Sequence, residues 1–197
     1  ADREAIQGDA STRSYARLSM HGRKAVLMNA PQDDEAPGEP DGASVELRRA
    51  LGYNAMARLA GPKLEAFLTV AQQLSMRGLS APHIIAADVE LGFALLEDFG
   101  DTDYWRVIHN APEMERPLYE AAVDVLAVIY RSSFAARSDY DGHEWLIREY
   151  DEAALLAETD LFLDFYAPDV GREVSDAARA EFYDLWRAAF ARLKTHA

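Results

Sequence analysis

The sequence predicts an α+β fold in which a small antiparallel sheet with one helix is followed by a mostly helical region. In the first half, short apolar or alternating stretches are separated by turn residues, which is typical of antiparallel strands. After residue 98, apolar side chains recur every three to four positions, which is the repeat of an amphipathic helix. This change of pattern predicts two domains, 1–97 and 98–197.

The first domain is expected to hold two strand pairs and one helix that packs on them, besides the segment at 32–60. The strands of the first pair meet at His21-Gly22-Arg23, and those of the second pair meet at Glu90-Leu91-Gly92. The helix carries its apolar side chains on one face and ends at Arg77-Gly78, a basic last turn followed by a glycine. The expected elements are strands at 12–20, 24–28, 84–88 and 93–97 and a helix at 63–76.

The segment between the two strand pairs has two further parts. Residues 32–44, QDDEAPGEPDGAS, are acidic and rich in proline and glycine, so they have almost nothing to bury and are expected to form a solvated loop. Residues 45–59 have helical spacing, and Gly61-Pro62 breaks that helix.

The second domain is expected to be built from helices. Ser175 is a suitable N-cap for the last of them, and residues 139–142 are expected to form a loop. Two of the helical faces have no partner in the sequence, so we expect this domain to be incomplete. The absence of an initiating methionine suggests that the chain begins inside a longer one. The expected helices lie near 115–134, 151–166 and 176–194.

The composition is that of a globular protein with a strongly acidic surface. The net charge of −14 repels nucleic acid and anionic membranes, so neither is expected as a partner. The chain has no cysteine, which excludes disulfides, thiolate zinc sites and a cysteine nucleophile and fits a reducing compartment. No stretch approaches the ~20 apolar residues that span a bilayer. We therefore expect a cytoplasmic monomer.

The loop before the first predicted strand reads Gly8-Asp9-Ala10-Ser11-Thr12-Arg13. Small residues let the backbone approach a ligand closely, and their free N–H groups suit an anion. Arg13 adds a planar fork of donors that matches phosphate. The loop is therefore a plausible lid over phosphates, although taken alone this stretch favours an ordinary surface hairpin with a polar tip.

The order of these pieces resembles the aminoglycoside phosphotransferase and choline-kinase-like family, which has a two-lobed protein-kinase-like fold. Within that family it is most similar to the bacterial anomeric N-acetylmuramate/N-acetylglucosamine kinases, with residues 32–60 as an insertion. The residues that carry the resemblance are Gly8 to Arg13 with Tyr15 and Arg17, Leu27-Met28-Asn29-Ala30-Pro31, Phe67, Leu74, Gly78, Ala81-Pro82, Gly92, Leu95-Leu96-Glu97-Asp98-Phe99-Gly100-Asp101, Glu158, Leu161-Phe162, Asp164 and Tyr166.

The resemblance implies a small-molecule kinase that transfers the γ-phosphoryl group of ATP, with Mg²⁺, to a hydroxyl of a small metabolite, an amino sugar first of all. The first lobe would bind the nucleotide, with Met28 as an apolar wall and the backbone at Glu97 to Phe99 on the adenine edge. For Met28 the alternative is plain core packing. The implied nucleotide-binding residues are Gly8, Asp9, Ser11, Thr12, Arg13, Met28, Glu97, Asp98 and Phe99.

The helical lobe would bind the acceptor, with Glu158 and Tyr166 as the implied substrate-binding residues. Two features depart from the family, namely the second strand and the catalytic loop. The second strand has no phosphate-binding lysine after Lys24, so we expect Arg13 to substitute, and Glu65 is a candidate for the helix glutamate that usually pairs with that lysine, or an ordinary exposed carboxylate.

The catalytic loop and the metal-binding aspartate of such kinases are absent from residues 1–197, so no catalytic residue and no metal ligand is expected in this chain. The carboxylates of Glu97, Asp98, Asp101 and Asp103 are interpreted as a solvated helix start rather than a metal site. Two alternatives to a kinase stay open: an inactive nucleotide-binding or interaction module of the same fold, and a helical binding protein in which the first hairpin is only structural.

Overall fold

The structure is a computed structural model that describes residues 2–6, 13–31 and 38–193. The chain forms two compact units, and each is described by itself. Unit 1 comprises 1–32 and 63–147, and unit 2 comprises 33–62 and 148–197. This grouping rests on contacts within each unit, whereas the lobes at 1–97 and 98–197 stay a prediction.

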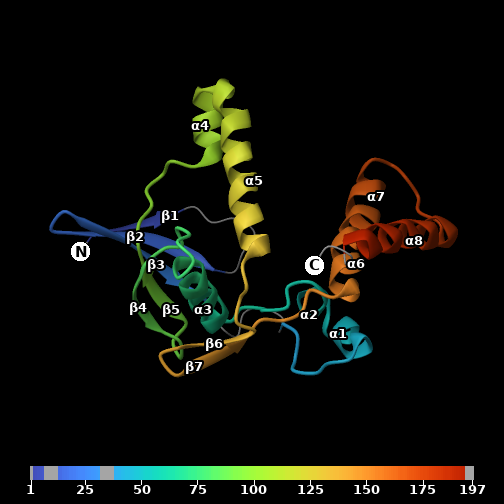
Figure 1. Ribbon diagram of the computed structural model, residues 1–197, viewed down its shortest axis with the longest axis horizontal. Coiled ribbons are helices and arrows are strands. Elements are labelled where there is room, and N and C mark those ends of the chain that lie inside the picture. The colour runs from blue at the N-terminus through green and yellow to red at the C-terminus, as the bar shows by residue number, and fades with distance from the viewer. Residues whose placement is uncertain (1, 7–12, 32–37, 194–197) are drawn as a thin grey trace. The chain divides into compact units, whose positions relative to one another are not determined.

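A five-stranded antiparallel sheet forms the centre of unit 1 (Figure 1). Its second and third strands join at His21 and Gly22, which have φ values of 51° and 76°. Positive φ at both turn residues matches the twist of a two-residue hairpin. In spatial order the strands are β1(Asp2–Ile6), β2(Ser14–Met20), β3(Arg23–Asn29), β5(Phe93–Leu96) and β4(Ile84–Asp88).

The predicted α+β class is confirmed, together with the two strand pairs. The structure adds β1, which pairs with β2 at the edge of the sheet. The sequence of β1, DREAI, is mostly charged and has no apolar face, so its pattern does not predict a strand. An edge strand tolerates such a sequence because its side chains stay in water.

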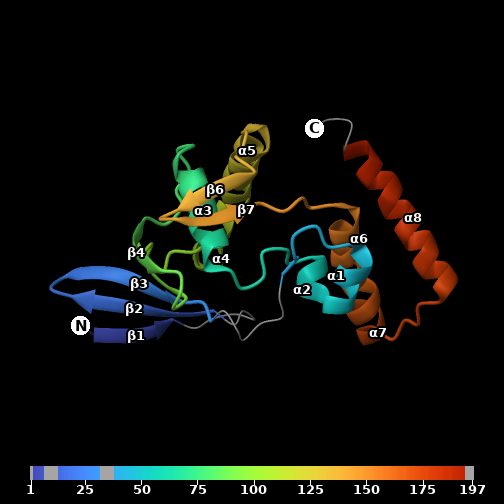
Figure 2. The ribbon, with the colours of Figure 1, turned by 90° about the horizontal axis from the view of Figure 1, so that it is seen from below.

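Helix α3(Leu64–Ser75) covers one face of the sheet and makes the core of unit 1 (Figure 2). Met28 lies opposite Ala94 in the register of β3 and β5, so the two side chains share that face. Met28, Leu64 and Leu68 are fully buried against one another, and burial of such side chains stabilises the fold by about 1.5–3 kcal/mol each. The predicted helix at 63–76 is therefore confirmed within one residue at each end.

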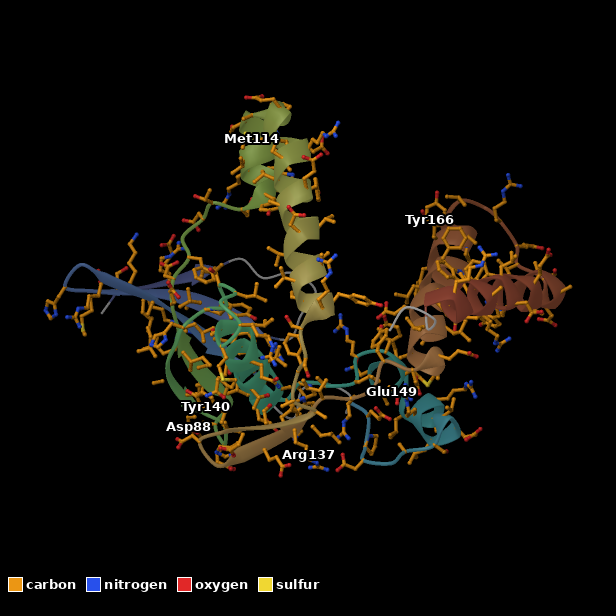
Figure 3. The ribbon with its side chains drawn as sticks, in the orientation of Figure 1. Asp88, Met114, Arg137, Tyr140, Glu149 and Tyr166 are labelled. Atoms are coloured by element: carbon orange, nitrogen blue, oxygen red, sulfur yellow. The ribbon has the colours of Figure 1, made fainter. Side chains whose placement is uncertain are left out.

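The rest of unit 1 is helix α4(Tyr104–Asn110), the short η1(Pro112–Met114), helix α5(Glu115–Arg131), and a hairpin of β6(Arg137–Tyr140) and β7(His143–Leu146). Helix α5 confirms the predicted helix, although it ends at Arg131. The loop predicted at 139–142 is wrong in its extent, because only Asp141 and Gly142 form the turn of the hairpin, with φ values of 51° and 85°. Figure 3 labels Tyr140, the last residue of β6, which packs against the core cluster of unit 1.

Gln73 fastens this hairpin segment to helix α3. Its amide is 1% exposed, and its Nε2 donates to the Ala135 carbonyl at 3.0 Å while its Oε1 accepts from the Ala135 amide at 2.9 Å. Nε2 also contacts the Ser138 hydroxyl at 3.3 Å. A buried amide satisfied on both sides fixes the geometry of the segments that it joins.

Unit 2 is helical. The predicted helix at 45–59 is interrupted at Gly52, whose φ of 101° ends the first helix and begins the second. The predicted helix at 151–166 is confirmed, with a π-helical last part, and Ser175 caps the last helix through a bond from the Ala178 amide. The elements are α1(Val45–Leu51), α2(Tyr53–Met56), α6(Glu152–Leu161), η2(Phe162–Tyr166), α7(Ala167–Asp169) and α8(Asp176–Leu193).

A buried arginine holds unit 2 together. Arg48 on α1 is 2% exposed and donates to the carbonyls of Ala55 and Met56 at 3.0 and 2.9 Å. Its guanidinium also binds Asp151 at 2.6 and 3.2 Å. Asp151 is the N-cap of α6 and accepts from the Ala154 amide. Arg48 thus ties α1 and α2 to the start of α6.

No helix in the described part of the chain combines the length and apolar character needed to cross a membrane.

Candidate functional site

The structure describes only part of the predicted phosphate lid. Gly8, Asp9, Ser11 and Thr12 lie outside the described residues. Arg13 is half-buried directly before β2. The lid and the role of Arg13 in it stay predictions.

The predicted adenine-binding segment is a turn at residues 97–101 that follows β5. The Glu97 amide donates to the His83 carbonyl at 2.9 Å, and the Glu97 carboxylate accepts from the His83 amide at 3.1 Å. These two bonds extend the pairing of β4 and β5 by one residue. The Glu97 amide is therefore already used within the protein.

An arginine clamp fixes the position of the turn. Arg17 on β2 donates through Nε to Asp98 Oδ2 at 2.7 Å and through Nη2 to Asp98 Oδ1 at 3.1 Å. The same guanidinium reaches both oxygens of Asp101, at 3.0 and 3.2 Å. Asp98 Oδ1 also accepts from the Gly100 amide at 2.9 Å. Two forked arginine–carboxylate pairs hold the turn against the sheet, with fixed planar geometry.

The clamp shifts the ionisation of its members in the expected directions. Hydrogen bonds from Arg17, assisted by the Gly100 amide, hold the pKa of Asp98 below its usual value, and Arg17 lowers the pKa of Asp101 as well. The pKa of Arg17 is raised, chiefly by its hydrogen bonds to Asp98 and, to a smaller extent, by those to Asp101. The Arg17 and Asp98 side chains are 12% and 5% exposed, so water screens this pair little.

Two backbone groups of the turn have no hydrogen-bond partner in the described part of the chain. Among the described residues, none donates to the Glu97 carbonyl and none accepts from the Phe99 amide. An acceptor and a donor two residues apart on a fixed segment match the donor–acceptor edge of a heteroaromatic base such as adenine. The Phe99 side chain is exposed beside them. The turn can therefore hold such an edge by backbone groups.

Met28 lies in the core of unit 1, with no exposed surface. The alternative of core packing describes its surroundings, which are Leu64, Leu68 and Ala94. Contact with a nucleotide stays a prediction for Met28, and this burial does not favour it. Lys24 is exposed at the start of β3.

Glu65 on α3 differs from the exposed carboxylate considered above. Its Oε2 is buried and has no hydrogen-bond partner within residues 2–6, 13–31 and 38–193. A buried carboxylate oxygen without a donor is costly, so this position is suited to a cation or a donor that comes from elsewhere.

The acidic residues near the turn have protein partners. Asp98 and Asp101 bind Arg17, and Asp103 caps α4 by accepting from the Arg106 amide at 2.7 Å. Over residues 2–6, 13–31 and 38–193, no group of three or more acidic or histidine side chains is arranged to hold a metal ion. Their observed role is therefore in pairing and capping.

The predicted acceptor residue Glu158 lies on α6 in unit 2. Its Oε2 accepts from the Tyr53 hydroxyl at 3.0 Å, and its Oε1 accepts from the Tyr150 hydroxyl at 2.9 Å. Partial desolvation of the hydroxyl and its bond to Glu158 raise the pKa of Tyr150 to about 12, and the same causes raise the pKa of Tyr53. Both tyrosines are therefore donors at neutral pH.

The other predicted acceptor residue, Tyr166, ends the π-helical segment η2 and is labelled in Figure 3. Its ring stacks on Phe162 with centroids 5.1 Å apart. Both rings line a cleft of about 420 Å³ in unit 2. Its walls are mostly apolar and include Val170, Val174 and Phe182, and Arg172 and Glu173 are its charged lining residues. Short π-helical segments are frequent at functional sites. The cleft is large enough for a small ligand.

Sequence reasoning did not find the partners of these residues. Arg17 lies 81 positions from Asp98, and Tyr53 lies 105 positions from Glu158. A single sequence carries no local signal for pairs so far apart. Tyr53 lies in the segment interpreted as an insertion, and Tyr150 directly before a predicted helix, so neither position suggested a bond to Glu158.

Comparison with known proteins agrees with the resemblance seen in the sequence. The chain is 41% identical over 185 residues to a Caulobacter vibrioides protein named N-acetylmuramate/N-acetylglucosamine kinase. The aligned residues make up 93% of this chain and 50% of that protein. A Pseudomonas aeruginosa protein of the same name is 32% identical over 162 residues, 80% of this chain and 36% of its own length. No family model matches.

The predicted similarity to this group of kinases is therefore confirmed. The chain spans at most about half the length of these relatives. Membership of the wider aminoglycoside phosphotransferase family stays a prediction. The two-lobed kinase-like fold also stays a prediction, although the antiparallel sheet and the helices of the structure are compatible with it.

Proposed function

We propose that this chain belongs to a sugar kinase that transfers the γ-phosphoryl group of ATP to a hydroxyl of an amino sugar. The observation that carries the proposal is the 41% identity, over 93% of the chain, to a protein named N-acetylmuramate/N-acetylglucosamine kinase. The alternative of an inactive module of the same fold has no observation in its favour.

The nucleotide is assigned to unit 1. The Glu97 carbonyl and the Phe99 amide hold the adenine edge, and the clamp of Arg17 on Asp98 keeps that segment in place. Arg13 and the residues before it, Gly8, Asp9, Ser11 and Thr12, are assigned to the phosphates, because the sequence there is rich in small residues. This part of the proposal is supported by the open backbone groups of the turn.

The acceptor is assigned to unit 2. Glu158 accepts hydrogen bonds from sugar hydroxyls, and the exposed ring of Tyr166 packs against an apolar face of the sugar. The partner is thus a small polyhydroxylated molecule. We also propose that the enzyme is a cytoplasmic monomer.

ATP would supply the phosphoryl group and Mg²⁺ would neutralise its charge, while the chain contributes positioning. No base and no Mg²⁺ ligand is assigned to the described residues, in which acidic side chains near the 97–101 turn are paired with Arg17 or cap a helix.

The test is phosphoryl transfer by the full-length protein. Mg-ATP is supplied with N-acetylglucosamine or N-acetylmuramate, ADP release is followed, and the sugar phosphate is identified by phosphorus NMR. Choline serves as a control acceptor that has a hydroxyl but no sugar ring. We expect ADP and a sugar phosphate in equal amounts with the amino sugars.

Two results would contradict the proposal in different ways. Nucleotide binding without transfer to either sugar would favour an inactive nucleotide-binding module. The absence of any thermal stabilisation by millimolar Mg-ATP would remove nucleotide binding as well, since a ligand that binds only the folded state must stabilise it.

A further inference from the structure

Glu158 is held by two tyrosines that come from separate segments of unit 2. Tyr53 belongs to α2, and Tyr150 lies just before α6. Each hydroxyl takes one carboxylate oxygen, at 3.0 and 2.9 Å. A carboxylate offers about four acceptor positions, so two remain for other donors. Glu158 itself is exposed, so these positions are open to a ligand.

The tyrosine of α2 is held in place by the buried arginine of the same unit. Arg48 binds the carbonyls of Ala55 and Met56, at the end of α2, and Asp151, the N-cap of α6. Because the same guanidinium binds both α2 and the N-cap of α6, it holds these two helices beside each other independently of the bond between Tyr53 and Glu158. A rigid support of this kind is what orientation of a binding group requires.

The surroundings of Glu158 suit a sugar. Phe162 lies one helical turn further along, and its ring begins the cleft of about 420 Å³ that Tyr166 also lines. A carboxylate one helical turn from exposed aromatic rings matches the two sides of a pyranose, whose hydroxyls are donors and whose C–H faces are apolar.

We propose that Tyr53 and Tyr150 are positioning residues that orient Glu158 toward the hydroxyls of the acceptor sugar, so that α2 contributes to acceptor specificity. This inference rests on the proposed function, because it takes an amino sugar as the ligand of Glu158. It adds that a segment interpreted as an insertion takes part in the acceptor site.

The test measures binding of N-acetylglucosamine to the full-length protein by calorimetry, together with KM for the sugar and for ATP. Tyr53→Phe and Tyr150→Phe each remove one hydroxyl and are expected to raise the Kd and the KM for the sugar by about three- to tenfold. The KM for ATP stays unchanged. Glu158→Ala raises the sugar Kd at least as much as either tyrosine variant.

A double-mutant cycle separates positioning from a general structural effect. In the Glu158→Ala background, Tyr53→Phe is expected to change the sugar Kd by less than about twofold. Tyr183→Phe is the matched control, because the Tyr183 hydroxyl also donates to a carboxylate of α6, that of Asp160. It is expected to leave the sugar Kd unchanged.

The inference is overturned if Tyr53→Phe weakens sugar binding by the same factor with and without Glu158, if Tyr183→Phe weakens it equally, or if the protein binds no sugar. Its failure and that of the proposed function are distinguishable. Sugar binding with the expected cycle but without phosphoryl transfer supports the inference and contradicts the kinase. Transfer with tyrosine variants that bind like the unchanged protein supports the kinase and contradicts the inference.

Discussion

The guanidinium of Arg17 on β2 and the carboxylate of Asp98 form a two-point pair, with Nε 2.7 Å from Oδ2 and Nη2 3.1 Å from Oδ1. The two residues are 81 positions apart. Their pair joins β2 to the turn that follows β5. Because Asp98 lies between Glu97 and Phe99, the pair fixes the backbone groups assigned to adenine.

We expect Arg17→Met to weaken nucleotide binding without removing any group that would contact the nucleotide. Loss of both forked pairs frees the 97–101 turn, so the Glu97 carbonyl and the Phe99 amide are no longer held in position. The KM for ATP of the full-length protein is expected to rise about tenfold, and the KM for the sugar to stay unchanged. Arg23→Met, at an exposed position on β3, is the matched control. An equal rise in both KM values would contradict a local effect on the turn.

The same pair predicts a pH dependence of stability. The pKa values of Asp98 and Asp101 are lowered in the folded state, chiefly by Arg17, so their contribution is complete above the unfolded value of about 3.9. It is lost as the pH falls through the lower folded values. The difference in free energy of unfolding between the unchanged protein and Arg17→Met, measured in urea, is therefore expected to be constant from pH 7 to about 5 and to shrink below about pH 4.

A difference that already shrinks between pH 7 and 5 would contradict this assignment, because it would require a group that titrates like histidine.

The sequence predicted those parts of the fold that have a local signature. Alternation and turn residues located β2 to β5, and helical spacing located α3, α5, α6 and α8. The pattern failed for β1, whose charged residues make backbone bonds at an edge, and for the hairpin at Asp141-Gly142, whose strands are too short and polar to show alternation.

The candidate site was predictable only as far as single residues. Glu97 to Phe99 and Glu158 were named as candidate binding residues by resemblance and stay predictions, whereas the bonds that orient them were not predicted. Arg17 lies on an alternating strand, where a charged residue reads as part of a solvated face. The two carboxylate partners of Arg17 and the two tyrosine partners of Glu158 depend on how distant segments pack. No local pattern carries that information.

Gln73 provides a test of the packing of unit 1. Gln73→Leu removes the side-chain partners of both the amide and the carbonyl of Ala135 and is expected to lower the free energy of unfolding by about 1–2 kcal/mol. Gln72→Leu, the exposed neighbour on α3, is expected to change it by less than about 0.5 kcal/mol. Urea unfolding of the full-length variants measures both. Equal effects would show that the amide of Gln73 does not fasten the β6–β7 segment.

Arg48 provides the corresponding test in unit 2, and it links stability to the site. Arg48→Met leaves Asp151 and two carbonyls without their buried partner, so we expect the free energy of unfolding to fall by about 2–4 kcal/mol, against less than about 0.5 kcal/mol for its exposed neighbour in Arg49→Met. Because Arg48 holds α2 beside α6, sugar binding by the folded protein should weaken by about the same factor as in Tyr53→Phe. Calorimetry at a temperature where the variant is folded measures this, and unchanged sugar binding would show that Tyr53 is positioned without the arginine.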